Sequence, residues 1–240
     1  MKTQGTQVRI LALRLLVAAL VLMGGQDGGA QETGADLPTV AVLDFTGFML
    51  GQGGNSAPLG KAVSAMLITE LSEREGLRVI ERYRLQDLLT EQRLSLSGRV
   101  DEETAIDVGR MVGAQYTVHG QVSSIGDMTR LDMRAVNVET SEILEVQKLT
   151  DQTSELLSLV VRMADIFIQK LQLDPPSARP DMATIPVQAT IEFSRAVDFE
   201  DRGEKEKAIE HYRKALEIHP DHREARKALD RLTGGEGGER

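Results

Sequence analysis

The sequence predicts a mixed α/β fold that is followed by a small all-α helical hairpin. Two strand-to-helix transitions carry the first part, because the spacing of apolar residues changes to a helical period within a short stretch. One joins a strand at 39–45 to a helix from Leu59, and the other joins a strand at 77–80 to a helix after Arg82. Three further strand-like segments follow Tyr116, so we expect a mixed sheet with flanking helices.

The amino-acid composition argues against several classes of function. The chain has 240 residues, of which 41% are hydrophobic and 3% aromatic, so we expect an aliphatic core. The formal net charge of −9 argues against a nucleic-acid or anionic-membrane surface, since both need clustered Lys and Arg. Cysteine is absent, which excludes disulfides, a cysteine nucleophile, cysteine zinc ligands and a lipidated cysteine.

Residues 1–30 have the order of a secretory signal peptide. Basic residues precede an uncharged apolar run at 15–23, and small residues at Gly28 and Ala30 occupy the cleavage-site positions. The run is too short for a membrane span, which needs about 20 residues. We therefore expect export to the periplasm, cleavage near Ala30 and no transmembrane segment in the mature chain.

The first strand-and-helix unit opens the predicted main domain at 38–173. Strand 39–45 is almost continuously apolar, as expected for a strand that is covered on both faces. Residues 46–57 are glycine-rich and are predicted to form a loop. A helix from Pro58 to about Arg74 follows, and Gly76 stops it. Its apolar stripe consists of Leu59, Val63, Met66, Leu67 and Leu71.

The second unit begins with strand 77–80 and passes directly into a helix that ends near Leu94. Glu81 and Arg82 occupy the switch, where α/β folds often place function, but we predict a structural role for both. Asp101 is expected to cap a third helix, which Gly113 ends.

Alternating polar and apolar residues then predict an antiparallel meander from Tyr116 to Leu149, with one wetter face. The alternation slips at Ala135 and Val136, which indicates a β-bulge. A helix at 154–173 closes the domain.

The C-terminal part resembles one tetratricopeptide-like (TPR) repeat. A proline-rich linker at 174–186 precedes a predicted helical module at 187–232, and 233–240 is expected to be disordered. A single repeat needs a further surface, which either the main domain or another chain could supply. We expect the prolines to hold the module away from the main domain, which favours an outside partner over docking, with Glu192 and Arg195 lining an exposed concave side. The residues that match the repeat spacing are Ala196, Phe199, Gly203, Ala208, Tyr212, Ala215 and Pro220.

Candidate chemistry is weak throughout. The glycine-rich loop before Lys61 departs from a Walker motif in its spacing, and Ala62 stands where Ser or Thr would bind Mg²⁺. Asp44 and Glu81 could form a carboxylate pair, but a salt bridge with Arg82 is the favoured alternative. The tail histidines do not have metal-ligand spacing. We expect no enzymatic activity, no cofactor and no metal.

Six short motifs lie in order along the chain, at 40–45, 59–60, 79–82, 88–92, 113–120 and 136–140. Together they resemble the CsgG-type family, which includes the curli secretion channel, a flagellar outer-membrane protein and penicillin-binding-protein activators. The resemblance covers 38–173 and implies an envelope-associated domain related to the TolB N-terminal fold, without known enzymatic activity. The motif residues to which we assign structural roles are Asp44, Phe45, Glu81, Arg82, Gly113, Ala114 and Gly120.

Two departures from the family limit what the resemblance implies. Characterised members are mostly lipoproteins, whereas this chain has no cysteine to lipidate. The turns near 123–129 and 139–142 leave no room for the inserted hairpins that build the channel's barrel. We therefore expect an exported adaptor that binds envelope proteins, with homo-oligomerisation as an option and at most peripheral association with the outer membrane. The alternatives are a component of a curli-like or other secretion or surface-structure apparatus and, less favoured, a nucleotide-binding regulator or an enzyme.

Overall fold

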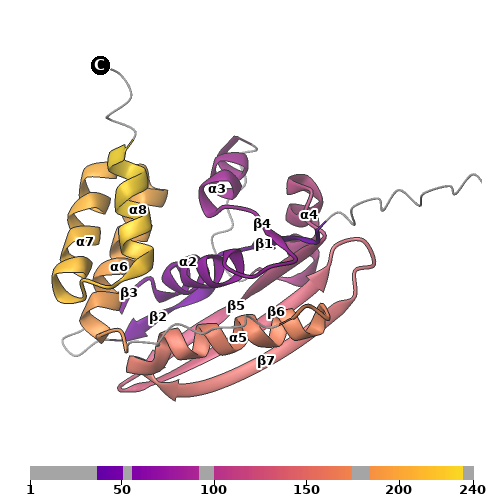
Figure 1. The fold of residues 1–240 in the computed structure, drawn as a ribbon, viewed down its shortest axis with the longest axis horizontal. Coiled ribbons are helices and arrows are strands. Elements are labelled where there is room, and N and C mark those ends of the chain that lie inside the picture. Colours follow the sequence, from indigo (N-terminus) through magenta and orange to yellow (C-terminus); the bar gives the residue numbers. More distant parts are fainter. Residues whose placement is uncertain (1–36, 51–55, 92–99, 175–183, 235–240) are drawn as a thin grey trace, which may run out of the picture. The chain divides into compact units, whose positions relative to one another are not determined.

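The computed structural model describes residues 37–50, 56–91, 100–174 and 184–234. The predicted signal peptide lies outside these residues. The strands are β1 (Thr39–Val42), β2 (Thr46–Leu50), β3 (Ser56–Ala57), β4 (Arg78–Val79), β5 (Tyr116–Ile125), β6 (Met128–Asn137) and β7 (Ile143–Gln152). The helices are α2 (Leu59–Ser72), α3 (Arg82–Glu91), α4 (Glu102–Val112), α5 (Leu156–Lys170), α6 (Val187–Asp201), α7 (Lys205–Ile218) and α8 (Arg223–Gly234) (Figure 1).

Strand β5 is the centre of the sheet. On one side it pairs in parallel with β1, with Val40 opposite Tyr116, and further along with β2, with Thr46 opposite Gln121. Strand β4 continues the sheet beyond β1, again in parallel. On its other side β5 pairs antiparallel with β6, and β6 pairs antiparallel with β7. The predicted mixed sheet is thus confirmed, and the predicted bulge is found as a register shift between Ala135 and Val136.

The prediction of a loop at 46–57 is wrong at both ends of the segment, where the structure has strands. Strand β2 begins at Thr46, and β3 pairs with it across residues 51–55, which lie outside the described residues. The glycine-rich run at 51–56 indicated a loop for the whole segment, but at Gly47 a Cβ would lie 1.7 Å from the carbonyl oxygen of Val122. Glycine is therefore required here for the close approach of β2 to β5, not for a turn.

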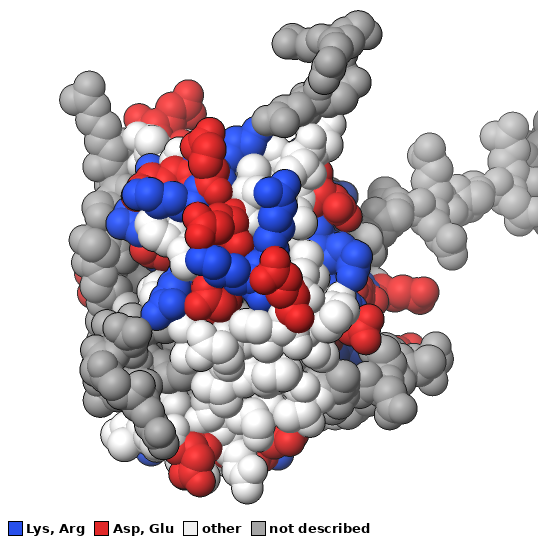
Figure 2. Space-filling view, turned by 90° about the vertical axis from the view of Figure 1, so that its left-hand side faces the viewer, with Lys and Arg blue, Asp and Glu red and all other residues white. Residues whose placement is uncertain are grey.

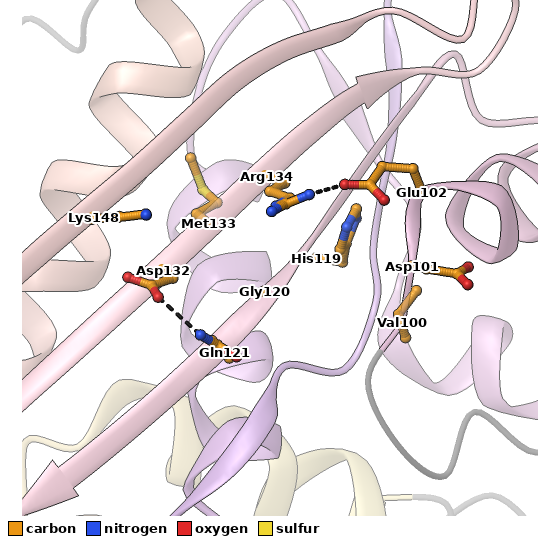
Figure 3. A pocket seen from close by; sticks show the side chains of 10 residues that line it. All are labelled: Val100, Asp101, Glu102, His119, Gly120, Gln121, Asp132, Met133, Arg134 and Lys148. Carbon is orange, nitrogen blue, oxygen red and sulfur yellow. Dashed lines mark hydrogen bonds and ion pairs between the residues drawn. The ribbon is translucent and has the colours of Figure 1, made fainter.

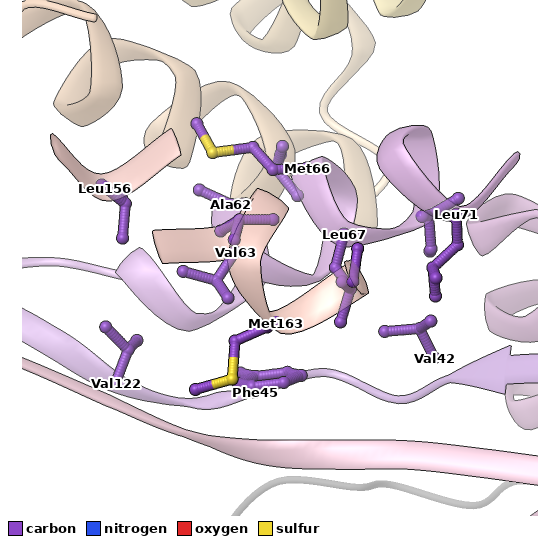
Figure 4. Packing of buried hydrophobic residues seen from close by; sticks show 14 of the residues in the cluster. Val42, Phe45, Ala62, Val63, Met66, Leu67, Leu71, Val122, Leu156 and Met163 are labelled. Carbon is purple, nitrogen blue, oxygen red and sulfur yellow. The ribbon is translucent and has the colours of Figure 1, made fainter. Parts of the chain in front are cut away.

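Helices cover the sheet in two groups. Helices α2 and α5 pack over one face, where the predicted stripe of α2 is fully buried with Phe45, Val122 and Met163 (Figure 4). Side chains of α3 and α4 form a smaller buried cluster with Leu43. The predicted helix at 154–173 is found as a 3₁₀ turn, Thr153–Glu155, followed by α5.

The C-terminal helices dock against the main domain, which contradicts the expected separation by the linker. Helix α6 packs along α2, and one apolar cluster runs from Val42 to Phe193 and Tyr212. Ile185, within the predicted linker, is 4% exposed and belongs to the same cluster. Apolar side chains on both surfaces outweigh the stiffness of the prolines. Helix α8 continues to Gly234, so the predicted disorder from residue 233 is also wrong at its start.

The surface of the helical side carries both signs of charge. Figure 2 shows acidic and basic side chains interleaved over the upper half of this face, where α6 to α8 lie, above a broad uncharged area with a few charged side chains at its bottom edge. Helix α7 contributes four basic and three acidic residues, since its sequence is KEKAIEHYRKALEI. A partner that docks on these helices would meet a mixed surface, not a field of one sign.

Candidate functional site

A cluster of partly buried ion pairs joins the main domain to α6. Asp44 follows β1 and Arg82 begins α3; they meet because β1 and β4 are parallel neighbours that end at the same edge. Nη2 of Arg82 lies 2.9 Å from both carboxylate oxygens of Asp44. The same guanidinium donates two hydrogen bonds to Asp201 at the end of α6, one of them 2.7 Å long. The side chain of Arg82 is only 14% exposed.

Lys61 on α2 adds a second cation to this cluster. Its ammonium lies 2.8 Å from Oδ1 of Asp198 and 2.8 Å from Oδ2 of Asp201. Three carboxylates therefore share two cations, and we call Asp44, Lys61, Arg82, Asp198 and Asp201 the junction cluster. Lys61, the lysine that was compared with a Walker motif, thus forms ion pairs with two carboxylates of the tail.

Asp44 and Asp201 of the junction cluster have opposite pKa shifts. Burial raises the pKa of Asp44 above its ordinary value, and the Arg82 guanidinium only partly opposes this rise. Burial acts in the same direction on Asp201, but hydrogen bonds and charges from Arg82 and Lys61 outweigh it and lower that pKa. Asp201 is therefore the carboxylate that the cations hold ionised.

The predicted salt bridge between Asp44 and Arg82 is confirmed. The alternative, a pair of carboxylates from Asp44 and Glu81, is not what the structure shows. The second carboxylate on Arg82 comes from Asp201 and not from Glu81. Glu81 is exposed, and its carbonyl oxygen accepts from the amides of Arg84 and Leu85 at the start of α3. No local pattern could have indicated Asp201, because it lies 119 residues from Arg82.

Next to this cluster lies a groove of about 330 Å³ between α2, the start of α3 and the helices α6 and α8. We call it the junction groove. Apolar side chains form its floor, namely Ala65, Ile68, Phe193, Val197 and Ala228, and charged groups of both signs surround them. An apolar floor with a polar rim is the usual anatomy of a protein-binding pocket.

Polar contacts hold the rim of the junction groove in place. The hydroxyl of Tyr212 donates to Glu200 at 2.7 Å, and Arg231 donates to the other oxygen of Glu200 at 2.6 Å. The Arg231 guanidinium lies 5.7 Å from the ring centre of Tyr83, which is 40% exposed. Tyr83 is therefore an exposed aromatic ring at the mouth of the groove.

The residues with repeat-type spacing divide into two groups. Ala196, Ala208, Tyr212 and Ala215 are buried, and Gly203 has φ +72 in the turn between α6 and α7. Phe199 is instead only partly buried and stacks on the His211 ring at 5.1 Å, and Pro220 is exposed. Phe193, which the sequence analysis missed, fills the interior and lies 5.8 Å from Tyr212. The tetratricopeptide-like assignment of the hairpin stays a prediction.

The predicted concave binding side is corrected. Glu192 is 7% exposed and its carboxylate binds Arg195 at 2.9 Å and Nδ1 of His211 at 2.6 Å. Gln188 is a third partner at 3.3 Å, and a buried carboxylate with three partners offers nothing to an incoming chain. The tail residues that remain accessible where the tail meets the main domain are those that line the junction groove.

The family-motif residues lie in structural positions. Gly113 has φ +69 and ends α4, whose N-terminus is capped by Asp101 through the amide of Thr104 at 2.9 Å, as predicted. Ala114 is buried beside it. A Cβ on Gly120 would lie 2.5 Å from the ring of Phe45, so this glycine makes room for the phenylalanine.

A second cavity of about 430 Å³ lies on the face of β5 to β7 opposite α5, at the start of α4 (Figure 3). Its lining carries charged residues of both signs. Arg134 pairs with Glu102, and Asp132 accepts from Gln121 at 2.9 Å and from Arg130 at 2.9 Å. The cavity is lined by Val100, Asp101, Glu102, His119, Gly120, Gln121, Asp132, Met133, Arg134 and Lys148.

Two searches of the described residues have negative outcomes. No group of three or more His, Asp or Glu side chains in these ranges is placed to hold a metal ion. Within the same ranges, no helix combines the length and the apolar character needed to cross a membrane.

Comparison with known proteins bears out the predicted family resemblance. A sequence model of the family described as curli production assembly/transport component CsgG matches residues 25–130. No curated protein matches the sequence significantly. Similar solved structures include the LpoB C-terminal domain from Salmonella enterica, at 21% identity and a TM-score of 0.40, covering 49% of this chain and 84% of that chain.

Two further structures are similar at lower identity. TolB from Acinetobacter baumannii matches at 14% identity and a TM-score of 0.40, covering 56% of this chain and 28% of that one. A PelC dodecamer from Paraburkholderia phytofirmans matches at 13% identity and a TM-score of 0.34, covering 59% and 92%.

Proposed function

From the CsgG family domain that residues 25–130 carry, we propose that this protein is an exported adaptor that binds other proteins of the cell envelope. The signal-peptide pattern of residues 1–30 supports export to the periplasm. The proposed mechanism is binding without catalysis.

The observation that carries the binding role is the junction groove. Main domain and tail line it together, so its shape depends on the docking of α6 on α2. The apolar floor would take one or two apolar side chains of a partner. The rim charges of Glu200, Lys227 and Arg231 would select for charge pattern.

Site-specific photo-crosslinking in the native envelope tests this role. A photoreactive phenylalanine replaces Tyr83 at the mouth of the groove or, as the control, Met111 on α4, which is likewise 40% exposed. We expect a discrete crosslinked envelope protein from position 83 that position 111 does not give. Thr69→Arg, which places a long cation in the groove, should abolish the product. Identical products from both positions, or no product from position 83, would contradict the proposal.

A second candidate function is a component of a secretion or surface-structure apparatus at the outer membrane. The description of the matching family, a curli assembly/transport component, favours it. Washing isolated envelopes with carbonate separates the two candidates. An adaptor without a lipidated cysteine should be released, whereas an apparatus component inserted in the membrane should require detergent.

A further inference from the structure

Strand β7 is a long, open edge of the sheet. It runs from Ile143 to Gln152 without glycine or proline, and among the described residues it pairs only with β6. In Figure 1 it forms the lower border of the sheet, and no described element lies beyond it. The strands at the other border, β3 and β4, are two residues each. Long unpaired edges are templates for another strand, and proteins usually shorten or interrupt them.

The hydrogen-bond pattern shows which groups of β7 face outward. The amide of Thr153 donates to Asp127 at 2.6 Å, and Asp132 lies opposite Lys148 in the ladder. Bonded and non-bonded pairs alternate in an antiparallel ladder, so the odd-numbered residues from 147 to 151 bond to β6. Lys148 and Thr150 therefore direct their backbone N–H and C=O groups away from the sheet.

The side chain of Lys148 places a cation beside this edge. It lines the polar cavity together with Asp132 and Gln121 of the neighbouring strands (Figure 3). The carboxylate of Asp132 is already hydrogen-bonded by Gln121 and Arg130, and Lys148 makes no ion pair with a side chain that the structure describes. On the opposite face, the partly buried Leu144 and Leu149 pack against the main apolar cluster.

We propose that β7 binds an extended segment of a partner protein, which adds to the sheet as a further strand. The segment carries an Asp or Glu opposite Lys148 and apolar residues at the alternate positions beside Leu149. Backbone hydrogen bonds from Lys148 and Thr150 supply affinity, and the alternating side chains supply selectivity. This inference goes beyond the proposed function, because it uses neither the junction groove nor the tail.

The test is a selection of random peptides of about ten residues on the folded full chain. We expect enriched peptides in which an acidic residue alternates with apolar ones. Thr150→Pro removes an outward N–H and no bond to β6, so the fold should persist while affinity falls at least about tenfold. Thr150→Ala keeps the N–H and should bind as the parent chain does. Thr69→Arg in the junction groove should also bind normally, which separates this test from that of the proposed function.

Amide hydrogen exchange provides the second readout. In the free protein the amides of Lys148 and Thr150 should exchange fast, and those of Leu149 and Asp151 slowly. A bound peptide should slow the first pair and leave the second pair unchanged. The proposal is overturned if no peptide is enriched, if the Pro and Ala variants bind alike, or if protection falls elsewhere. Concentration-dependent self-association that Thr150→Pro abolishes would assign the edge to a second copy of this chain instead.

Discussion

The two sides of helix α2 are held by different means. Towards the sheet, α2 presents aliphatic side chains that are fully buried with Phe45 and Val122. Towards the tail, it presents Ile68 next to α6 and extends Lys61 into the junction cluster. Ten of its residues are buried, and they include the polar Ser64 and Glu70.

This difference predicts how each side fails. Apolar contacts tolerate change in proportion to the volume that is lost. Buried charges contribute little net stability as a set, but the removal of one leaves its partners buried without compensation. The stability of the tail side should therefore fall more when a single charged side chain is removed, and that of the sheet side when a single apolar side chain is shortened.

Truncation after Asp174 should have the largest effect on this comparison. It exposes the tail-facing side of α2, and each large aliphatic side chain returned to water costs about 1.5–3 kcal/mol. We expect the free energy of unfolding to fall by roughly 3–5 kcal/mol, with increased binding of a hydrophobic dye. Urea unfolding of the two chains measures it. Equal stability would show that the tail is a separable module after all.

Arg82→Ala should come next. It leaves Asp44 and Asp201, which are 20% and 10% exposed, close together without a shared cation, so we expect a loss of about 3 kcal/mol in the free energy of unfolding. Adding Asp201→Asn should restore about 1–2 kcal/mol, since it removes one of the uncompensated charges. Urea unfolding of the single and double variants measures the coupling. Additive losses would mean that the charges are screened by water.

Two substitutions that each shorten one aliphatic side chain of α2 compare its two sides directly. Leu67 faces the main core at 1% exposure, and Ile68 lines the junction groove at 5% exposure. Leu67→Ala should cost about 3 kcal/mol and Ile68→Ala about 2 kcal/mol, because the site beside a groove can relax or admit water. Thermal and urea unfolding give both values. A larger cost for Ile68→Ala would show that α2 packs more tightly against the tail than against the sheet.

The sequence was sufficient for the elements that repeat locally. The stripe of α2, the caps at Asp101 and Gly113 and the bulge at Ala135 all follow from spacing or residue type over a few positions. The apolar face that α2 turns to α6 was missed because a helix that is apolar on several sides shows only one of its stripes clearly. Strand β2 was missed because the glycine-rich run at 51–56, whose composition is typical of a loop, follows it directly.

The candidate sites depend on contacts that no local pattern encodes. Arg82 could be paired with Asp44 because both follow parallel strands, but Asp201 and Asp198 reach the cluster only through the docking of α6. The expected separation of the tail failed for the same reason, since the linker's composition says nothing about the surfaces it joins. Phe193 and not Phe199 fills the interior, because the docked α6 turns that side towards α2.

The last comparison lies within the junction cluster and concerns pH. Asp201 has a pKa below its ordinary value in the folded chain, so its stabilisation is present above the unfolded pKa and is lost as the pH falls through the folded one. Asp44 has a raised pKa, so its protonation in the folded chain begins first on acidification and offsets part of that loss.

Asp44→Asn should therefore separate the two contributions and have the smallest effect at neutral pH. The amide keeps the shape and one acceptor for Arg82, so we expect a change of about 1 kcal/mol at pH 7. Below about pH 5 the variant should lose stability more steeply than the parent, because only the loss at Asp201 remains. Urea unfolding of both chains between neutral pH and about pH 3 measures the slopes. Parallel slopes would show that Asp44 does not take up a proton before Asp201, and that the two carboxylates titrate as equals.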